Sequence, residues 1–164
     1  LMTRRDTVTA YLYQSTSPYS KIDSAKSVID SISFTGDFKF YNAASETYYI
    51  AMKHFNTIET WSKTGGESLV NNGMVYNYDF TSSITNAYGN NLKLRGSKYC
   101  LYSGDVNQDG AVDLTDGSLI DNDAANFVSG YYVPTDLNGD GVVDVTDAVF
   151  ADNNGYNFVS KLTP

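Results

Sequence analysis

Two aspartate-rich segments of this 164-residue chain have the residue types and spacing to bind metal ions. Residues 105–116 read DVNQDGAVDLTD, and residues 136–147 read DLNGDGVVDVTD, 31 positions later. Oxygen-bearing side chains recur at positions 1, 3, 5, 9 and 12 of each segment, and position 6 is glycine. Calcium takes about six to eight oxygen ligands, and EF-type loops supply them from these positions. The segments therefore predict two calcium sites.

The predicted ligands are side-chain oxygens together with one backbone carbonyl in each segment. In the first segment they are Asp105, Asn107, Asp109, Asp113, Asp116 and the carbonyl of Ala111. In the second they are Asp136, Asn138, Asp140, Asp144, Asp147 and the carbonyl of Val142. Magnesium fits less well, because it demands octahedral geometry and keeps its waters. Two complete copies in one register disfavour the alternative that these are merely acidic surface turns.

Position 12 departs from an ordinary EF-type loop, which has a bidentate glutamate there. Both segments have aspartate instead, as Asp116 and Asp147. Because aspartate is one methylene shorter, a bidentate grip requires the backbone to come closer to the ion.

The charge of the chain is divided unevenly around these segments. Residues 1–104 hold 10 basic and 8 acidic side chains, whereas residues 105–164 hold 1 basic and 11 acidic ones. This asymmetry predicts two modules, residues 1–102 and 103–164. Two bound calcium ions would take the second module from −10 to −6, and we expect metal to contribute to its folding.

The first module has the composition of a β domain. Short runs rich in β-branched and aromatic residues alternate with Gly, Asn and Ser clusters. Strands are predicted near residues 7–14, 27–34, 37–41, 47–54, 74–80 and 98–102. The predicted fold class is mainly β: an antiparallel Ig-like β-sandwich, followed by a small α module with two EF-type calcium loops.

Composition excludes several classes of protein. One Cys and one His cannot build a structural zinc site or an internal disulfide. A net charge of −8 without a basic cluster disfavours nucleic acid as a partner. No apolar run is long enough to span a bilayer, and the first residues lack the apolar stretch of a signal peptide, which is typical of a mature product or an excised fragment.

The remaining chemistry-bearing residues favour structural roles. We expect His54 to be a structural or surface residue and Cys100 to be buried in a strand. The tyrosines of the first module and Trp61 fit core packing better than an exposed platform for sugars. Glu46, Glu59 and Glu67 are candidates for a glycosidase pair, but their separation does not follow from the sequence. No catalytic motif is present, so the sequence predicts that the chain is not an enzyme.

Residues 103–160 resemble the dockerin family, whose two calcium loops of this form each lead into a helix. The resemblance implies a compact module with near two-fold internal symmetry and helices from about Asp116 and about Asp147. It also implies that residues just before the last ligand, Leu114, Thr115, Val145 and Thr146, contact a cohesin partner in two related orientations. Where type I dockerins have a Lys-Arg pair, this chain has Asp-Asn at 121–122 and 152–153.

A second resemblance concerns the pairing of the two modules. Tyr48-Tyr49-Ile50, Lys53-His54, Glu59-Thr60-Trp61 and residues 102–107 look like the C-terminal regions of large secreted bacterial proteins. That resemblance implies an accessory role in a secreted, extracellular or cell-surface protein.

Together these features predict a non-catalytic secreted protein that binds two Ca²⁺ ions and mediates calcium-dependent protein–protein association. The partner is a cohesin-like domain or another copy of the chain in a self-assembled filament. The alternative is a carbohydrate-binding accessory fragment of a secreted polysaccharide hydrolase, with a polysaccharide as ligand.

Overall fold

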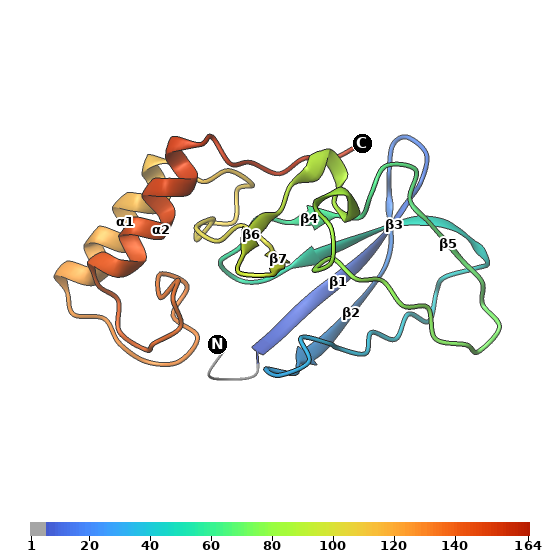
Figure 1. Cartoon of the computed structure of the whole chain (residues 1–164), viewed down its shortest axis with the longest axis horizontal. Coiled ribbons are helices and arrows are strands. Elements are labelled where there is room, and N and C mark those ends of the chain that lie inside the picture. Colours follow the sequence, from blue (N-terminus) through green and yellow to red (C-terminus); the bar gives the residue numbers. More distant parts are fainter. Residues whose placement is uncertain (1–5) are drawn as a thin grey trace. The chain divides into compact units, whose positions relative to one another are not determined.

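The computed structural model describes residues 6–164, which form two compact units (Figure 1). The helical unit consists of His54–Ile58 and Tyr102–Lys161, and the sheet unit consists of residues 6–53, Glu59–Leu101 and Leu162–Pro164. The sequence-based division at residues 102 and 103 did not assign residues 54–58 to the second module. They belong there because the apolar side chain of Ile58 is fully buried in the core of the helical unit.

The sheet unit is built on one five-stranded antiparallel sheet. Its strands follow the order β2–β1–β3–β4, and β5 also pairs with β3. A two-stranded hairpin, β6–β7, forms the second sheet among the described residues. The strands are β1 (Asp6–Gln14), β2 (Lys21–Ile29), β3 (Glu46–Lys53), β4 (Thr60–Trp61), β5 (Glu67–Leu69), β6 (Lys93–Arg95) and β7 (Lys98–Cys100). The prediction of a mainly β first half is confirmed.

Both faces of the main sheet carry buried side chains, because successive residues of a strand point to opposite faces. Ala10, Leu12 and Tyr48 are buried on one face. On the other face, Trp61 stacks on Tyr13 with ring centroids 4.2 Å apart. Trp61 is only 5% exposed, so the prediction that it is a core residue is confirmed. It offers no flat surface to a sugar.

Two predicted strands, residues 37–41 and 74–80, are wrong. Residues 37–41 do alternate in exposure, but no neighbouring strand pairs with them. Instead, the backbone N–H groups of Tyr41 and Asn42 donate to the carboxylate of Asp23, at 2.7 and 2.8 Å. The alternation therefore indicates that one side of the segment is partly buried. It does not indicate that the segment is a strand of a sheet.

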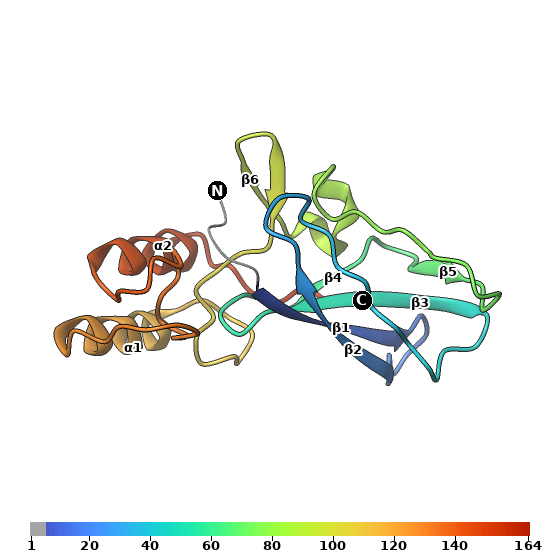
Figure 2. The same ribbon diagram turned by 90° about the horizontal axis from the view of Figure 1, so that it is seen from below.

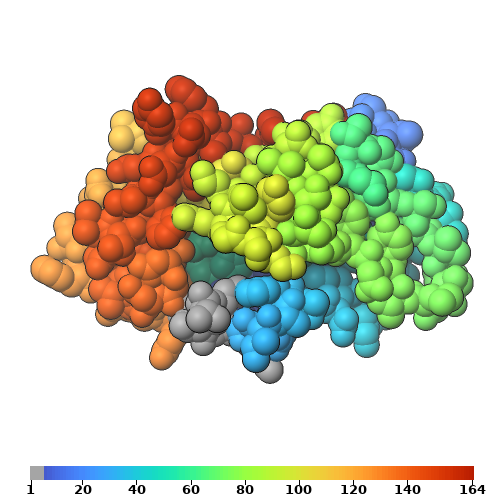
Figure 3. Space-filling model, in the orientation of Figure 1, coloured from blue at the N-terminus to red at the C-terminus, as the bar shows by residue number. Residues whose placement is uncertain are grey.

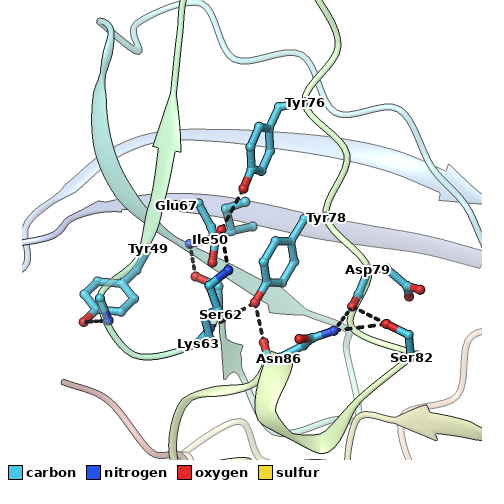
Figure 4. Close-up of polar contacts among 11 residues, drawn as sticks. Tyr49, Ile50, Ser62, Lys63, Glu67, Tyr76, Tyr78, Asp79, Ser82 and Asn86 are labelled. Atoms are coloured by element: carbon cyan, nitrogen blue, oxygen red, sulfur yellow. Dashed lines mark hydrogen bonds and ion pairs between the residues drawn. The ribbon is translucent and has the colours of Figure 1, made fainter.

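Segment 74–80 is held by side chains around a buried glutamate (Figure 4). The Tyr76 hydroxyl donates to Glu67 Oε2 at 2.7 Å, and Lys63 Nζ lies 3.3 Å from the same oxygen. The Tyr78 hydroxyl donates to the carbonyl of Asn86 at 2.6 Å and accepts from the backbone N–H of Lys63. Burial, and then the carboxylate of Glu67, raise the pKa of Tyr76 to about 12. These tyrosines are therefore neutral donors that anchor a segment without strand pairing.

Two other groups of residues from the sequence analysis are Cys100 and the three candidate glutamates. Cys100 was expected to be buried, and this is wrong, because the thiol is exposed at the end of β7. Glu59 and Glu67 are buried, whereas Glu46 is exposed. Among residues 6–164, neither helix is long and apolar enough to cross a membrane.

The stacked aromatics give a first prediction. Trp61→Ala removes a buried indole and should lower the free energy of unfolding of the sheet unit by about 3–5 kcal/mol. Tyr41→Ala is the control, because Tyr41 is 84% exposed and its loss should change this value by less than about 0.5 kcal/mol. Urea unfolding followed by circular dichroism measures both, and equal stabilities would refute the core assignment.

Candidate calcium-binding site

Each aspartate-rich segment leads directly into a helix. The helices are α1 (Leu114–Ala125) and α2 (Val145–Tyr156), and they begin two residues earlier than predicted. Their N-caps are Asp113 and Asp144, whose carboxylates accept the N–H groups of Thr115 and Thr146 at 2.7 Å. An N-cap aspartate satisfies an otherwise unbonded donor of the first turn. The Thr146 hydroxyl, which donates to the same carboxylate at 2.7 Å, and then the Thr146 N–H hold the pKa of Asp144 below its ordinary value.

The two helices lie side by side and antiparallel (Figures 1 and 2). Gly155, in the last turn of α2, lies against Val112 and Asp113 at the start of α1. A Cβ atom at residue 155 would lie 3.5 Å from the carbonyl oxygen of Val112, an ordinary van der Waals contact, so this helix packing does not itself require glycine. The buried core between the helices and loops consists of Ile58, Val112, Ile120, Val143, Ala151 and Val159.

Backbone pairing gives the unit an internal two-fold relation. The N–H of Val112 donates to the carbonyl of Val159, and the N–H of Val143 donates to the carbonyl of Val128, both at 2.9 Å. These two bonds are equivalent, because Val143 lies 31 residues after Val112 and Val159 lies 31 residues after Val128. Each loop therefore pairs with the segment that follows the helix of the other repeat.

The aspartate at position 12 is the most enclosed residue of each loop. Asp116 is fully buried, and its Oδ1 accepts the N–H groups of Val106 at 2.9 Å and Asn107 at 3.1 Å. Its Oδ2 accepts the N–H of Asp113 at 3.0 Å. Buried carboxylates are costly unless they are hydrogen-bonded, and three N–H donors supply this compensation.

Asp147 makes the same three bonds in the second loop. Its carboxylate accepts the N–H groups of Leu137 at 2.7 Å, Asn138 at 2.9 Å and Asp144 at 3.0 Å. The two loops therefore share one hydrogen-bond pattern and not only one sequence motif.

Positions 1 and 6 shape the turn of each loop. The Oδ2 atom of Asp105 accepts the N–H of Gly110 at 3.2 Å, and Asp136 accepts that of Gly141 at 2.9 Å. Both glycines have φ near +90°, at 96° and 90°, where other residues are strained. This finding explains why position 6 is glycine in both copies.

The remaining candidate ligands lie toward solvent. Asn107 Oδ1 accepts the N–H of Asp109, and Asn138 Oδ1 accepts that of Asp140, at 2.8 and 2.7 Å. Asp109 and Asp140 are exposed. Across residues 6–164, no three His, Cys, Asp or Glu side chains cluster as a metal site. The donor set of each loop is completed by an amide and a backbone carbonyl, both oxygen ligands that calcium accepts.

The predicted partner-binding residues lie at the starts of the two helices. Leu114 and Val145 are 84% and 72% exposed, and Thr115 and Thr146 are exposed beside them. Sequence reasoning missed two further exposed residues, Phe127 and Phe158, just after the helices. Their rings are 87% and 89% exposed, and both have φ of 53°. The signal was available, since Asn-Phe-Val-Ser recurs in both copies.

A second prediction concerns the buried carboxylate at position 12. Asp116→Asn replaces an acceptor oxygen by a donor facing backbone N–H groups. We expect the free energy of unfolding of the helical unit in calcium to fall by about 2 kcal/mol or more. Asp121→Asn is the matched control, because Asp121 is exposed on α1. Circular dichroism measures the thermal unfolding of both variants. Equal melting temperatures would contradict this role of Asp116.

Comparison with known proteins finds similarity at the level of structure. No family model and no curated protein matches the chain. Two solved structures do: a C-terminal and an N-terminal interface mutant of a type II cohesin–X-dockerin complex from Acetivibrio cellulolyticus. The first has a TM-score of 0.50 at 18% identity and covers 92% of this chain and 81% of the other. The second has a TM-score of 0.51 at 18% identity and covers 94% of this chain and 83% of the other. At this identity, the likeness shows a shared fold.

Proposed function

We propose that the helical unit binds two calcium ions and docks to a protein partner as part of an extracellular assembly. The observation that carries this proposal is the pair of equivalent hydrogen-bond networks around Asp116 and Asp147. Each network ties the backbone of positions 2, 3 and 9 of an EF-type loop to a carboxylate that is fully buried at position 12. Acidic surface turns have no reason to share such a network.

Calcium would supply charge compensation in a unit whose acidic side chains far outnumber its basic ones. Residues 105–164 contain 11 acidic groups and only Lys161 as a base. Asp105, Asp116, Asp136 and Asp147 are buried, so their mutual repulsion is weakly screened by solvent. A divalent ion held in each loop would offset that repulsion, and its binding free energy would add to the folding free energy. The bound metal would thus rigidify the docking surface.

The docking surface we propose lies at the two ends of the helix pair. The Val112–Val159 hydrogen bond brings the segments of Leu114 and Phe158 to the same end. Its counterpart between Val143 and Val128 does the same for Val145 and Phe127. Exposed aromatic and aliphatic side chains are typical anchors of protein interfaces. In Figure 3 the red surface of α2 and the orange surface of the second loop are open to solvent on the side shown.

The structural comparisons support the choice of a protein partner. The matched structures are complexes whose printed description joins cohesin to X-dockerin. An alignment over 92% of this chain includes residues of both units, as expected for a component that combines two modules. Together with the dockerin-like loops, this supports a non-catalytic, secreted docking protein. The partner is a cohesin-like domain or a second copy of the chain.

The carbohydrate-binding alternative has less support. Its main residue, Trp61, is stacked on Tyr13 inside the sheet unit. Glu59 accepts a hydrogen bond from the indole N–H of Trp61 at 2.8 Å, and Glu67 accepts from Tyr76. These carboxylates therefore have structural partners, and no observation favours a glycan ligand.

A third prediction tests calcium binding itself. Isothermal titration calorimetry should give two calcium ions for the natural chain, one for Asp109→Ala and none for Asp109→Ala/Asp140→Ala. Chelation should remove the helical circular dichroism, because the helical unit loses its charge compensation. The fluorescence of Trp61, the one tryptophan of the chain, should persist, since it reports the sheet unit. Unchanged helicity and melting after chelation would contradict the proposal.

A fourth prediction tests docking. Association should be measured in millimolar calcium and in chelator, by sedimentation velocity for self-association and by interferometry against type II cohesin domains. Leu114→Glu/Val145→Glu should weaken the calcium-dependent association about tenfold or more, because it buries charge in an apolar contact. Ser118→Glu is the control, an exposed substitution on α1. No association in calcium, or equal association of both variants, would refute this docking surface.

A further inference from the structure

We infer that Asn56, from the segment between β3 and β4, positions the second calcium loop by supplying an amide donor that this loop lacks. This inference rests on the proposed calcium function and assigns a residue to it that lies outside both loop motifs. It starts from a difference between the two otherwise equivalent loops, at position 4.

The first loop carries its own amide donor at position 4. Gln108 stands there, and its Nε2 donates to the carbonyl oxygen of Asp105, the residue at position 1. The same nitrogen lies 3.5 Å from the carbonyl of Thr57. The position-1 peptide of the first loop is therefore held from within the loop.

The second loop has no side chain at position 4, because Gly139 stands there. The equivalent carbonyl, that of Asp136, accepts a hydrogen bond from Asn56 Nδ2 at 3.3 Å. An asparagine 80 residues upstream thus occupies the role that Gln108 has in the first loop. Both position-1 carbonyls are bound by a side-chain amide, one from the loop and one from a distant segment.

Asn56 is itself held firmly in the helical unit. It is 5% exposed, and its own carbonyl accepts the N–H of Gly104 at 2.9 Å. Its Oδ1 lies 2.9 Å from Nδ1 of His54. Because Nδ2 donates to Asp136, Oδ1 is the acceptor here and Nδ1 of His54 is the donor. Two residues later, Ile58 is fully buried in the core and donates its N–H to the carbonyl of Tyr102.

The bond matters for calcium because Asp136 is both the anchor of the turn and a predicted ligand. Its carboxylate accepts the N–H groups of Gly139 at 2.7 Å and Gly141 at 2.9 Å. Fixing the carbonyl of the same residue restricts the orientation of that carboxylate. Residues that orient ligands in this way commonly change metal affinity by about 10–100-fold.

The geometry allows the missing amide to be returned to the loop. Gln108 has φ of 62° and Gly139 has φ of 76°, so glutamine already adopts this conformation in the first loop. A Cβ atom built at Gly139 meets no atom within 4 Å. Gly139→Gln is therefore a designed rescue of a chain that lacks the Asn56 amide.

The experiment isolates each loop by disabling the other. In an Asp109→Ala background, calorimetry reports the second loop, and Asn56→Ala should weaken its calcium affinity about tenfold or more. Adding Gly139→Gln should restore most of that affinity, whereas Gly139→Ala should not. In an Asp140→Ala background, where only the first loop binds, Asn56→Ala should leave the affinity unchanged.

Hydrogen exchange in the otherwise natural chain provides a second readout that does not need the disabled loops. In calcium, Asn56→Ala should raise exchange in residues 136–147 more than in residues 105–116. An equal loss at both loops, no loss at either, or no rescue by Gly139→Gln would overturn the inference. Absence of calcium binding by the natural chain would instead refute the proposed function, so the two failures are distinguishable.

Discussion

The hydrogen bonds between the buried aspartates at position 12 and the backbone N–H groups organise the helical unit. Asp116 and Asp147 each bind the second and third residues of their loop and the N-cap of the following helix. These bonds determine where the loop closes and where the helix begins. Because a carboxylate buried without such donors would be strongly destabilising, the loop and helix are expected to form together.

The two loops of the helical unit share one backbone pairing, but they differ in the side chain that binds the carbonyl of position 1. Each loop pairs with the segment after the opposite helix, which explains why the repeat includes residues 126–129 and 157–160 as well as the loops. The symmetry fails at position 4, where the first loop has Gln108 and the second has Gly139. In the second loop, Asn56 donates the hydrogen bond that Gln108 donates in the first. A continuous stretch of sequence therefore does not contain the whole unit, since Asn56 and Ile58 come from far upstream.

The sequence predicted the starts of the two helices to within two residues, because a helix start depends on nearby residues such as the N-cap aspartates. The calcium ligands stay a prediction. The sequence predicted β1 and β3 closely, but it placed the second strand near residues 27–34, whereas β2 ends at Ile29. Asp30 ends that strand, since its carboxylate accepts the N–H groups of Ile32 and Ser33 and turns the chain. Periodicity cannot distinguish a paired strand from the segment tied to Asp23, and no local pattern indicates that Asn56 reaches Asp136.

The most direct test of this account is a crystal structure grown in millimolar calcium, with anomalous scattering data to identify the ions. The account predicts one ion in each loop, about 2.3–2.6 Å from oxygens of positions 1, 3, 5, 7 and 12, with position 9 bound directly or through a water. It also predicts that the two position-12 carboxylates keep their backbone donors. A well-ordered map with the helical unit folded and no ion in either loop would contradict it.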